Sequence, residues 1–223
     1  MGDSQTKGRF EDVRWLRNHW SRRTGRRGYY WFLTFENATE LHSLAKECQE
    51  AIAFPYYDPI SPEGLHLTLD RIAFEGDISA AELSSIVKSS ASACQRICPF
   101  EISIGKLGGT RGAIGFTVGP LQPLRILRNA FRSATLEIYP EAPVKSDEFL
   151  PHVSIAYANS DGVDAADAVK AVTGINSTHR MVGVPVTEAK LVLLEQQEHS
   201  YSWQVISRIP LSGSNGNTAE HHH

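Results

Sequence analysis

The chain has 223 residues, of which 41% are apolar and 21% charged, and its formal net charge is −3 at pH 7. This ordinary globular composition suffices for one large domain or two small lobes. No apolar stretch is long enough to cross a bilayer and no signal-peptide core is present, so we expect no membrane partner. The 3 cysteines lack a Cys-x-x-Cys pair, which disfavours a disulfide framework or a zinc site and favours a cytoplasmic location.

The N-terminal segment is strongly basic. Residues 1–27 hold 8 Lys or Arg and 3 Asp or Glu, a net charge of +5, while the other 14 basic and 22 acidic residues give −8. We interpret residues 1–27 as a basic extension, solvated and partly mobile, whose arginines can touch a nucleic-acid backbone. Within it, residues 9–22 are predicted to form a short helix carrying Trp15, Leu16 and Trp20.

A strand and a helix follow this extension. The aromatic and apolar run Tyr29–Phe35 predicts a strand buried on both faces. The segment Asn37–Glu40 is typical of a capping box, which predicts a helix start. The apolar face of that helix is expected to hold Leu41, Leu44, Ala45, Cys48 and Ile52. A proline-containing loop, residues 54–64, then leads to the next strand.

Two strand-like segments share the pattern His, apolar, hydroxyl, apolar: His66–Leu69 and His152–Ile155. Side chains alternate between the faces of a strand, so His66 and Thr68 point the same way, as do His152 and Ser154. Two such strands facing one another would place two imidazoles and two hydroxyls around one small space.

Each His strand begins a similar series of a helix and two further strands. In the first half a capping box, Ser79–Glu82, opens the helix. The strands that follow it are predicted at 100–106 and 113–118, and those of the second half at 186–195 and 202–209, after a helix near 164–173. A helix over 124–138 links the halves.

This order predicts an α+β fold. We expect a bilobal domain over residues 28–211, in which a pseudo-two-fold axis relates two lobes. Each lobe is expected to have an antiparallel-rich sheet with outer helices, and the His strands should meet across a central cleft. Residues 212–223 are polar and end in three histidines, which predicts a disordered tail or tag remnant.

A pair of histidines suits phosphoryl chemistry, because an unperturbed imidazole with a pKa of about 6.5 can act as acid or base near neutrality. One ring takes a proton from the nucleophile while the other protonates the leaving oxygen. Thr68 and Ser154 can donate hydrogen bonds to the non-bridging oxygens, where charge grows in the transition state. This set of two histidines and two hydroxyl residues needs no metal and no cofactor for the reaction. The remaining context-free histidines are interpreted as structural or surface residues: His19, His42, His179 and His199.

On these residues the chain resembles the two-histidine (2H) phosphoesterases, in the branch called 2'-5' RNA ligase-like or cyclic phosphodiesterase. The resemblance spans about residues 28–211 and includes the approach Phe149–His152 and the hairpins at 102–118 and 191–211. It implies metal-independent hydrolysis of a 2',3'-cyclic phosphate, on an RNA end or a nucleotide, to a 2'-phosphate. It also implies that His66 and His152 are the acid–base pair and that Thr68 and Ser154 bind phosphate, with Ser154 standing where threonine is commoner.

Aromatic residues near the predicted cleft can stack a nucleobase, although packing is an equally good interpretation of each. These candidates are Tyr56, Tyr57, Tyr157, Tyr201 and Trp203. Simple alternation turns Tyr157 away from Ser154 and Arg71 away from Thr68. We therefore leave Arg71, together with Arg111 of the glycine-rich turn, outside the core site.

Other functions remain compatible with the same residues. The reverse reaction, RNA 2'-5' ligation, would use the same four side chains. A specialised enzyme for another cyclic or 2'-5' phosphodiester, or a nucleotide- or RNA-binding module without turnover, is a further alternative. In each case we expect a monomer.

Overall fold

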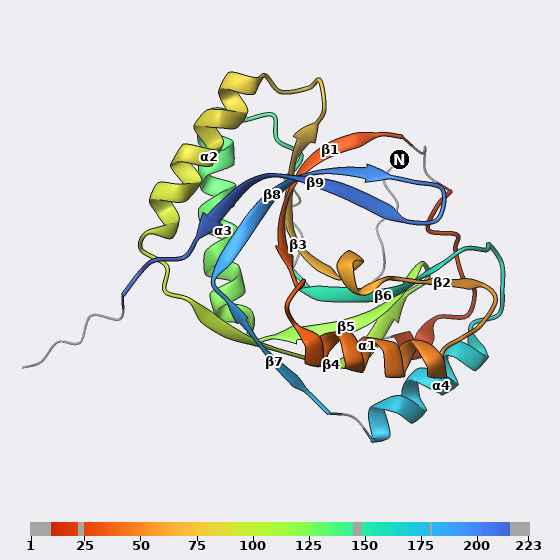
Figure 1. Cartoon of the computed structure of the whole chain (residues 1–223). Coiled ribbons are helices and arrows are strands. Elements are labelled where there is room, and N and C mark those ends of the chain that lie inside the picture. The colour runs from red at the N-terminus through yellow and green to blue at the C-terminus, as the bar shows by residue number, and fades with distance from the viewer. Residues whose placement is uncertain (1–9, 22–24, 145–148, 179, 215–223) are drawn as a thin grey trace, which may run out of the picture.

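The computed structural model describes residues 10–21, 25–144, 149–178 and 180–214. Two antiparallel sheets share one apolar core, and helices lie on their outer sides (Figure 1). The helices are α1 (Thr39–Ala51), α2 (Ala80–Cys94), α3 (Leu121–Ile138) and α4 (Ala166–Ser177), with the 3-10 turns η1 (Phe10–Asp12) and η2 (Pro62–Gly64). The predicted α+β, two-lobed architecture is confirmed.

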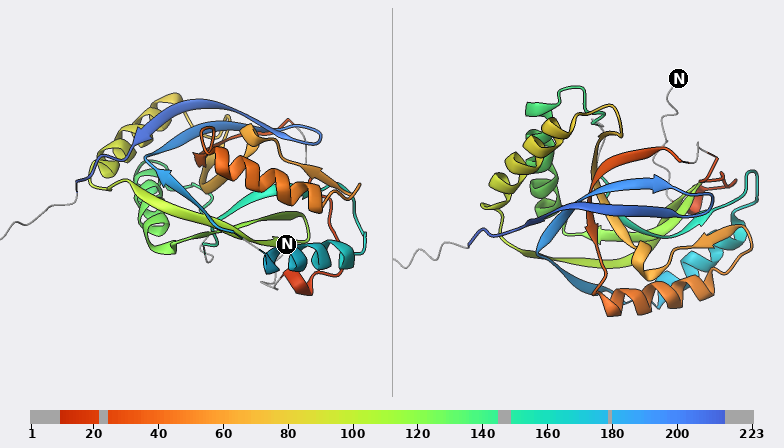
Figure 2. Two further views of the ribbon diagram at one scale, coloured as in Figure 1. Left: turned by 60° about the horizontal axis from the view of Figure 1, so that its bottom comes forward. Right: turned by 45° about the horizontal axis from the view of Figure 1, so that its top comes forward.

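The first sheet has the strand order β3–β1–β8–β9, and the second has the order β2–β6–β5–β4–β7. The first consists of β1 (Arg27–Thr34), β3 (His66–Phe74), β8 (Glu188–Gln196) and β9 (Tyr201–Pro210). The second consists of β2 (Tyr57–Pro59), β4 (Phe100–Thr110), β5 (Ala113–Gly119), β6 (His152–Ala158) and β7 (Val182–Val186). Helices α2 and α3 pack together beside the first sheet, and α1 and α4 contact the second (Figure 2).

The two halves of the chain exchange their hairpins. The first His strand, β3, shares a sheet with the β8–β9 hairpin of the second half, and the second His strand, β6, pairs with the β4–β5 hairpin of the first half. Each lobe is therefore built from both halves of the chain. The repeated order of elements does not reveal this exchange, because hydrogen-bond partners far apart in sequence leave no local signal.

Strand β7 was not predicted. Its burial alternates, with Val182, Val184 and Val186 buried between exposed Gly183 and Pro185. It is the edge strand beside β4, a position that tolerates a proline. The sequence interpretation merged Val186 with β8, whereas the chain changes sheets between Val186 and Glu188.

The helix starts were predicted with unequal success. At α2 the capping box is present: Glu82 N donates to Ser79 Oγ at 3.2 Å, and Ser79 N donates to the Glu82 carboxylate at 2.9 Å. At α1 the predicted box is wrong, since Ala38 occupies the N-cap and no side chain caps the helix. The apolar face predicted for α1 is nevertheless buried, including Ile52 just beyond its end.

Residues 10–21 pack onto the body of the protein, so the predicted helix and solvated arm are wrong there. Phe10, Leu16 and Trp20 are buried. Backbone hydrogen bonds join Leu16 N to Val163 O at 2.8 Å and Arg17 N to the carbonyl of Arg111 at 2.8 Å. Residues 1–9 and 22–24, which include Arg22 and Arg23 of the basic extension, lie outside the described residues.

The described part of the C-terminus also makes contacts. Ser212 N donates to Cys94 O at 3.3 Å, and Gly213 N donates to Ile97 O at 3.0 Å, so these two residues of the predicted tail rest on the end of α2. Residues 215–223, including the three final histidines, lie outside the described residues. Within the described ranges, no helix combines the length and apolarity needed to cross a membrane.

Candidate active site

The two histidines occupy the first positions of β3 and β6, and these strands contact one another across the sheets. On β3 the side chains of Leu67 and Leu69 are buried while Thr68 is exposed, as the alternating pattern predicts. On β6, His152 is exposed and Ser154 is buried. The two strands that carry the four predicted residues thus lie against one another.

Both imidazoles are oriented by the same kind of hydrogen bond. His66 Nδ1 donates to Gly64 O at 2.8 Å, and His152 Nδ1 donates to Leu150 O at 2.9 Å. A carbonyl oxygen only accepts, so each Nδ1 carries a proton. In the neutral ring this leaves a lone pair on Nε2, the atom that is free to exchange a proton with a substrate.

His66 is much more enclosed than His152. The Phe32 ring stacks on its imidazole at a centroid distance of 4.3 Å, and the Trp203 ring lies edge-on at 5.3 Å. Burial, together with the charge of His152, outweighs the bond to Gly64 and lowers the pKa of His66 to about 4. The effect of His152 places the two rings within electrostatic range. Opposite Ser154 in the second sheet stands Gly115, with no ring to cover His152 as Phe32 covers His66.

Each His strand contains a β-bulge at the third residue after the histidine. Phe32 pairs with Thr68 and Trp31 with Asp70, which leaves Leu69 as the extra residue of β3. In the same way, β5 pairs with Ser154 and Ala156, which leaves Ile155 as the extra residue of β6. A bulge resets the alternation of side chains beyond it.

The bulges bring the fifth residue after each histidine onto the face of the hydroxyl. On β6, the side chain of Tyr157 lies close enough to Ser154 for the serine hydroxyl to act on the pKa of the phenol. On β3, Arg71 stands opposite Tyr30, which shares a face of β1 with Phe32, the partner of Thr68. The expectation that Tyr157 and Arg71 turn away was wrong, because a strict period of two assumes a regular strand.

A helix side chain donates a hydrogen bond to the carbonyl oxygen of each bulged residue. Arg128 Nε of α3 donates to Leu69 O at 3.0 Å. Gln49 Nε2 of α1 donates to Ile155 O at 2.8 Å, beside a second bond from Ile60 N at 2.9 Å. These side chains hold the bulged backbone in place and were not identified from sequence, since neither belongs to a motif.

The base-stacking candidates separate into two groups. Trp203 lies beside His66 and stays half-exposed, so it remains a candidate. Tyr57 is buried and Tyr56 stacks on Phe54 at 5.2 Å, away from the histidines, so the structure gives them a packing role. Tyr157 is buried as well, and burial raises its pKa strongly.

Tyr157 is covered by the N-terminal segment. The His19 ring stacks on it at 3.9 Å, and His19 Nε2 hydrogen-bonds the Tyr201 hydroxyl at 2.8 Å. The Trp20 ring packs edge-on against Tyr157 at 5.1 Å. His19, interpreted from sequence as a structural or surface histidine, lies half-buried in a turn and packs in this cluster, and Tyr201 belongs to the same cluster.

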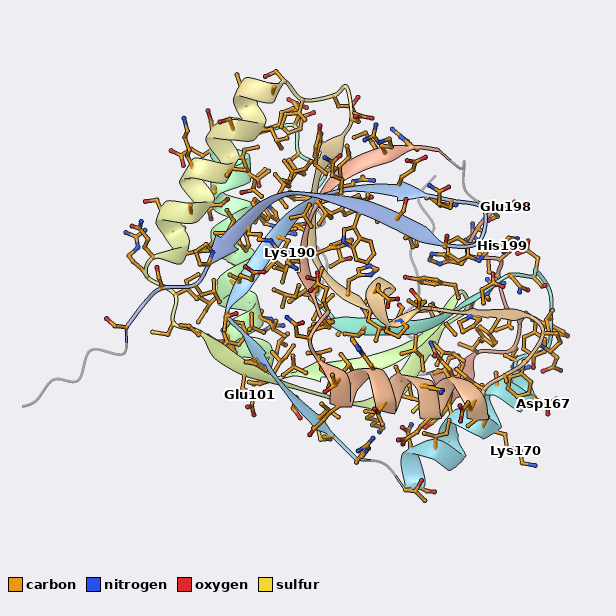
Figure 3. The ribbon with its side chains drawn as sticks, in the orientation of Figure 1. Glu101, Asp167, Lys170, Lys190, Glu198 and His199 are labelled. Carbon is orange, nitrogen blue, oxygen red and sulfur yellow. The ribbon has the colours of Figure 1, made fainter. Side chains whose placement is uncertain are left out.

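Asp58 fastens this aromatic cluster to its surroundings. Its carboxylate accepts hydrogen bonds from Trp20 Nε1 at 2.8 Å, His199 Nδ1 at 2.8 Å and Asn159 Nδ2 at 2.9 Å. Burial alone would raise the pKa of Asp58, but these bonds lower it. His199 lies at the turn of the β8–β9 hairpin, far along the chain from Trp20 (Figure 3).

The other sequence candidates lie outside the site. Arg111 Nε donates to Trp15 O at 3.1 Å, which commits it to the N-terminal segment. His42 Nε2 bonds Phe35 O at 2.7 Å, a structural contact as predicted, and His179 lies outside the described residues. In the described ranges, no three His, Cys, Asp or Glu side chains gather as metal ligands would.

The sequence profile of the 2'-5' RNA ligase superfamily matches residues 38–198. The chain belongs to this superfamily, that of the two-histidine phosphoesterases. No curated protein sequence matches the chain.

Solved structures share its fold. The protein TT0787 of Thermus thermophilus is 20% identical with a TM-score of 0.63, over 85% of this chain and 100% of that one. E. coli LigT complexed with 3'-AMP is 16% identical with a TM-score of 0.59, over 85% and 99% of the two chains. LigT complexed with NADP+ is 16% identical with a TM-score of 0.59, over 84% and 99%. At such identities the likeness establishes the fold alone.

Proposed function

We propose that this protein is a metal-independent phosphodiesterase that hydrolyses the 2',3'-cyclic phosphate of an RNA end or a nucleotide to a 2'-phosphate. The observation that supports this most is the matched pair of histidines, each with Nδ1 bound to a backbone carbonyl and Nε2 left for the substrate. LigT, which shares the fold, has been solved with 3'-AMP and NADP+, and this supports a nucleotide as the ligand.

The unequal surroundings of the two rings suggest their roles. His66 is packed between Phe32 and Trp203 and, with its lowered pKa, is neutral at neutral pH, as a general base must be. His66 Nε2 takes a proton from water as the water oxygen bonds to phosphorus. His152 Nε2 donates a proton to the ribose 3'-oxygen as its bond to phosphorus breaks. Exchange with solvent then restores both rings.

Substrate binding is expected to change the pKa values of the two histidines. A bound phosphate places negative charge beside both imidazoles, and an adjacent anion favours the protonated form of a histidine. The pKa of His66 therefore rises from about 4 towards neutrality in the complex, which makes it a stronger base where it is needed.

The hydroxyls are placed to stabilise the charge that develops on phosphate. Thr68 is exposed on the same face as His66 and can donate directly to a non-bridging oxygen. Tyr157 lies close to Ser154, and a hydrogen bond between their hydroxyls would restrain the Ser154 rotamer. Such a bond would supply the restraint that a serine lacks relative to threonine.

A product analysis tests the proposal. Nucleoside 2',3'-cyclic phosphates, 2'-5' dinucleotides and cyclic dinucleotides are incubated with the protein in excess chelator, and phosphorus NMR identifies each product. We expect 2'-phosphates from the cyclic monoesters. His66→Asn and His152→Asn should each lower kcat by about 10²- to 10⁴-fold, whereas His42→Asn, which loses a structural bond to Phe35 O, should not.

Other outcomes would identify the alternatives. Ligated product in the presence of a 5'-hydroxyl oligonucleotide would indicate the reverse reaction. Binding without turnover of any substrate would indicate a non-catalytic module, and activity abolished by chelator would contradict the metal-independent mechanism.

The proposal also includes the setting of the protein. The three cysteines are free, with Cys48 and Cys94 buried, which supports a reducing, cytoplasmic location. Burial raises the pKa of the Cys48 and Cys94 thiols to about 11, so neither is activated as a nucleophile. We propose that the protein acts as a monomer.

A further inference from the structure

The two His strands carry similar residues at the histidine and hydroxyl positions of the candidate site. They differ at the next position on the same face, which is Arg71 on one strand and Tyr157 on the other. Arg71 and Tyr157 occupy equivalent positions, five residues after His66 and His152 and two after a bulge. Both lie on the face of the hydroxyl residue of their strand. The pseudo-two-fold pattern therefore places a cation on one side of the histidine pair and a phenol ring on the other.

The Tyr157 end is filled by protein. His19 and Trp20 cover the Tyr157 ring, and Tyr201 closes the cluster from the β8–β9 hairpin. Hydrogen bonds attach this segment to both sheets: His19 N donates to Ala158 O at 2.8 Å, and the side chain of Gln196 donates to Trp20 O at 3.3 Å. A substrate larger than one nucleotide cannot extend past Tyr157 without displacing them.

The Arg71 end presents positive charge. The guanidinium carbon of Arg71 lies 4.4 Å from the centroid of the Phe74 ring, and that of Arg26 lies 3.2 Å from the same centroid. Among the described residues, no carboxylate forms an ion pair with either arginine, whereas neighbouring Arg27 is paired with Glu75 at 3.2 Å.

The bulge at Leu69 also turns the nearest carboxylate, that of Asp70, away from the face that carries Arg71. Asp70, adjacent to Arg71 in sequence, is turned to the opposite face of β3. There its carboxylate pairs with Arg132 at 2.8 Å and, more distantly, with Arg128 at 3.8 Å. The charge of Arg71 is thus left available on the face that carries His66 and Thr68.

We propose that Arg71, assisted by Arg26, binds a second phosphate of the substrate, on the 5' side of the nucleotide whose cyclic phosphate lies between the histidines. This inference rests on the proposed function and specifies its substrate class. The second phosphate is either the 5'-phosphate of a mononucleotide or the phosphodiester that joins the terminal nucleotide of RNA to the rest of the strand. Both present the same anionic oxygens to a guanidinium.

The spacing fits such a substrate. Thr68 and Arg71 are separated by roughly 7–10 Å along the strand, given about 3.3 Å per residue and one bulged residue. One nucleoside can bridge two phosphates over this range, and the long arginine side chain adjusts the remainder. Arg26 and Arg71 are pre-positioned by the shared Phe74 ring, which reduces the ordering cost of binding.

Three substrates test the assignment: adenosine 2',3'-cyclic phosphate, the same compound with a 5'-phosphate, and the dinucleotide ApA with a terminal 2',3'-cyclic phosphate. We expect higher kcat/KM for the last two. Arg71→Gln should lower kcat/KM for these two by about tenfold more than for the first, mostly through KM, because the lost contact serves binding. Arg71→Lys should retain part of the preference.

Arg180→Gln is the matched control, since Arg180 is exposed and pairs with Glu47 on α1. Any effect of this variant on kcat/KM should be the same for all three substrates. The preference should also shrink as salt rises, because the arginines are accessible to solvent. An equal loss with all three substrates in Arg71→Gln would overturn the proposal and indicate a structural role. A preference for the dinucleotide alone would identify RNA as the source of the phosphate.

A binding measurement keeps the inference separate from turnover. Calorimetry compares adenosine 2'-phosphate with adenosine 2',5'-bisphosphate, using wild type and Arg71→Gln. We expect the bisphosphate to bind wild type about tenfold more tightly, and the variant to lose most of that gain. If the extra phosphate adds nothing in wild type, the proposal is wrong even if the protein is an active phosphodiesterase. If the gain is present but no substrate is hydrolysed, only the proposed activity fails.

Discussion

His66 and His152 hold the same hydrogen bond in opposite sheets: each Nδ1 donates to the carbonyl oxygen of the residue two positions earlier. The two rings nevertheless differ in their surroundings, because aromatic rings enclose His66 and none does so for His152 among the described residues. The two histidines are therefore held in the same way but buried to different extents. This difference in burial suggests that they have different protonation roles, although the sequence motif treats them alike.

The lowered pKa of His66 predicts a pH-dependent stability. Between an unfolded pKa of 6.5 and a folded pKa of about 4, the unfolded chain binds more protons, so the free energy of unfolding falls as pH falls through this window. The loss for this one group is at most about 3 kcal/mol. Urea denaturation at pH 7 and pH 4.5 should show a smaller drop for His66→Asn than for wild type. An identical drop would contradict the burial of this ring.

Because Tyr157 lies close to Ser154, we predict that Tyr157 positions Ser154 through a hydrogen bond between the two hydroxyls. Tyr157→Phe keeps the ring packed under His19 but removes the hydroxyl that would bond Ser154. Losing one such bond costs about 1 kcal/mol, or roughly fivefold in kcat. Removing the donor itself in Ser154→Ala should cost more, and the double variant should be no worse than Ser154→Ala. Additive losses in steady-state kinetics would show that the two hydroxyls act independently.

Strand β5 approaches the second His strand very closely at Gly115. A Cβ at Gly115 would lie 2.6 Å from Val153 O and 2.8 Å from Ser154 Cα, so an alanine must displace the backbone between His152 and Ser154. Gly115→Ala should destabilise the fold by about 1–3 kcal/mol and lower activity. Gly174→Ala is the control, since nothing lies within 4 Å of its Cβ position in α4, and it should stabilise by up to about 1 kcal/mol. Thermal denaturation compares the two.

Because residues 10–21 pack onto the body of the protein, we predict that they add to its free energy of unfolding. Leu16 is 1% exposed whereas Trp15 is 54% exposed. Leu16→Ala should lower the free energy of unfolding by about 2–5 kcal/mol, while Trp15→Ala should change it by no more than about 0.5 kcal/mol. If chemical denaturation found both variants equal to wild type, this segment would be an appended arm after all.

The sequence was most informative where the structure is regular and local. The alternation around His66 and His152 and the capping box at Ser79 concern neighbours a few residues apart, and each gave the correct element. The exchange of hairpins between the halves depends on pairing between distant strands, which no local pattern encodes. The bulges at Leu69 and Ile155 break the period on which alternation relies, and this is why Arg71 and Tyr157 were assigned to the wrong face.

The most direct test of the shared site is an NMR titration of the histidine side chains with adenosine 2'-phosphate. Before ligand is added, nitrogen shifts should show Nδ1 protonated in neutral His66 and His152. During the titration both rings should respond along one binding curve with one ligand per protein, and the pKa of His66 should rise from about 4. A response from one ring only, or two curves with different affinities, would contradict a common phosphate pocket between the two imidazoles.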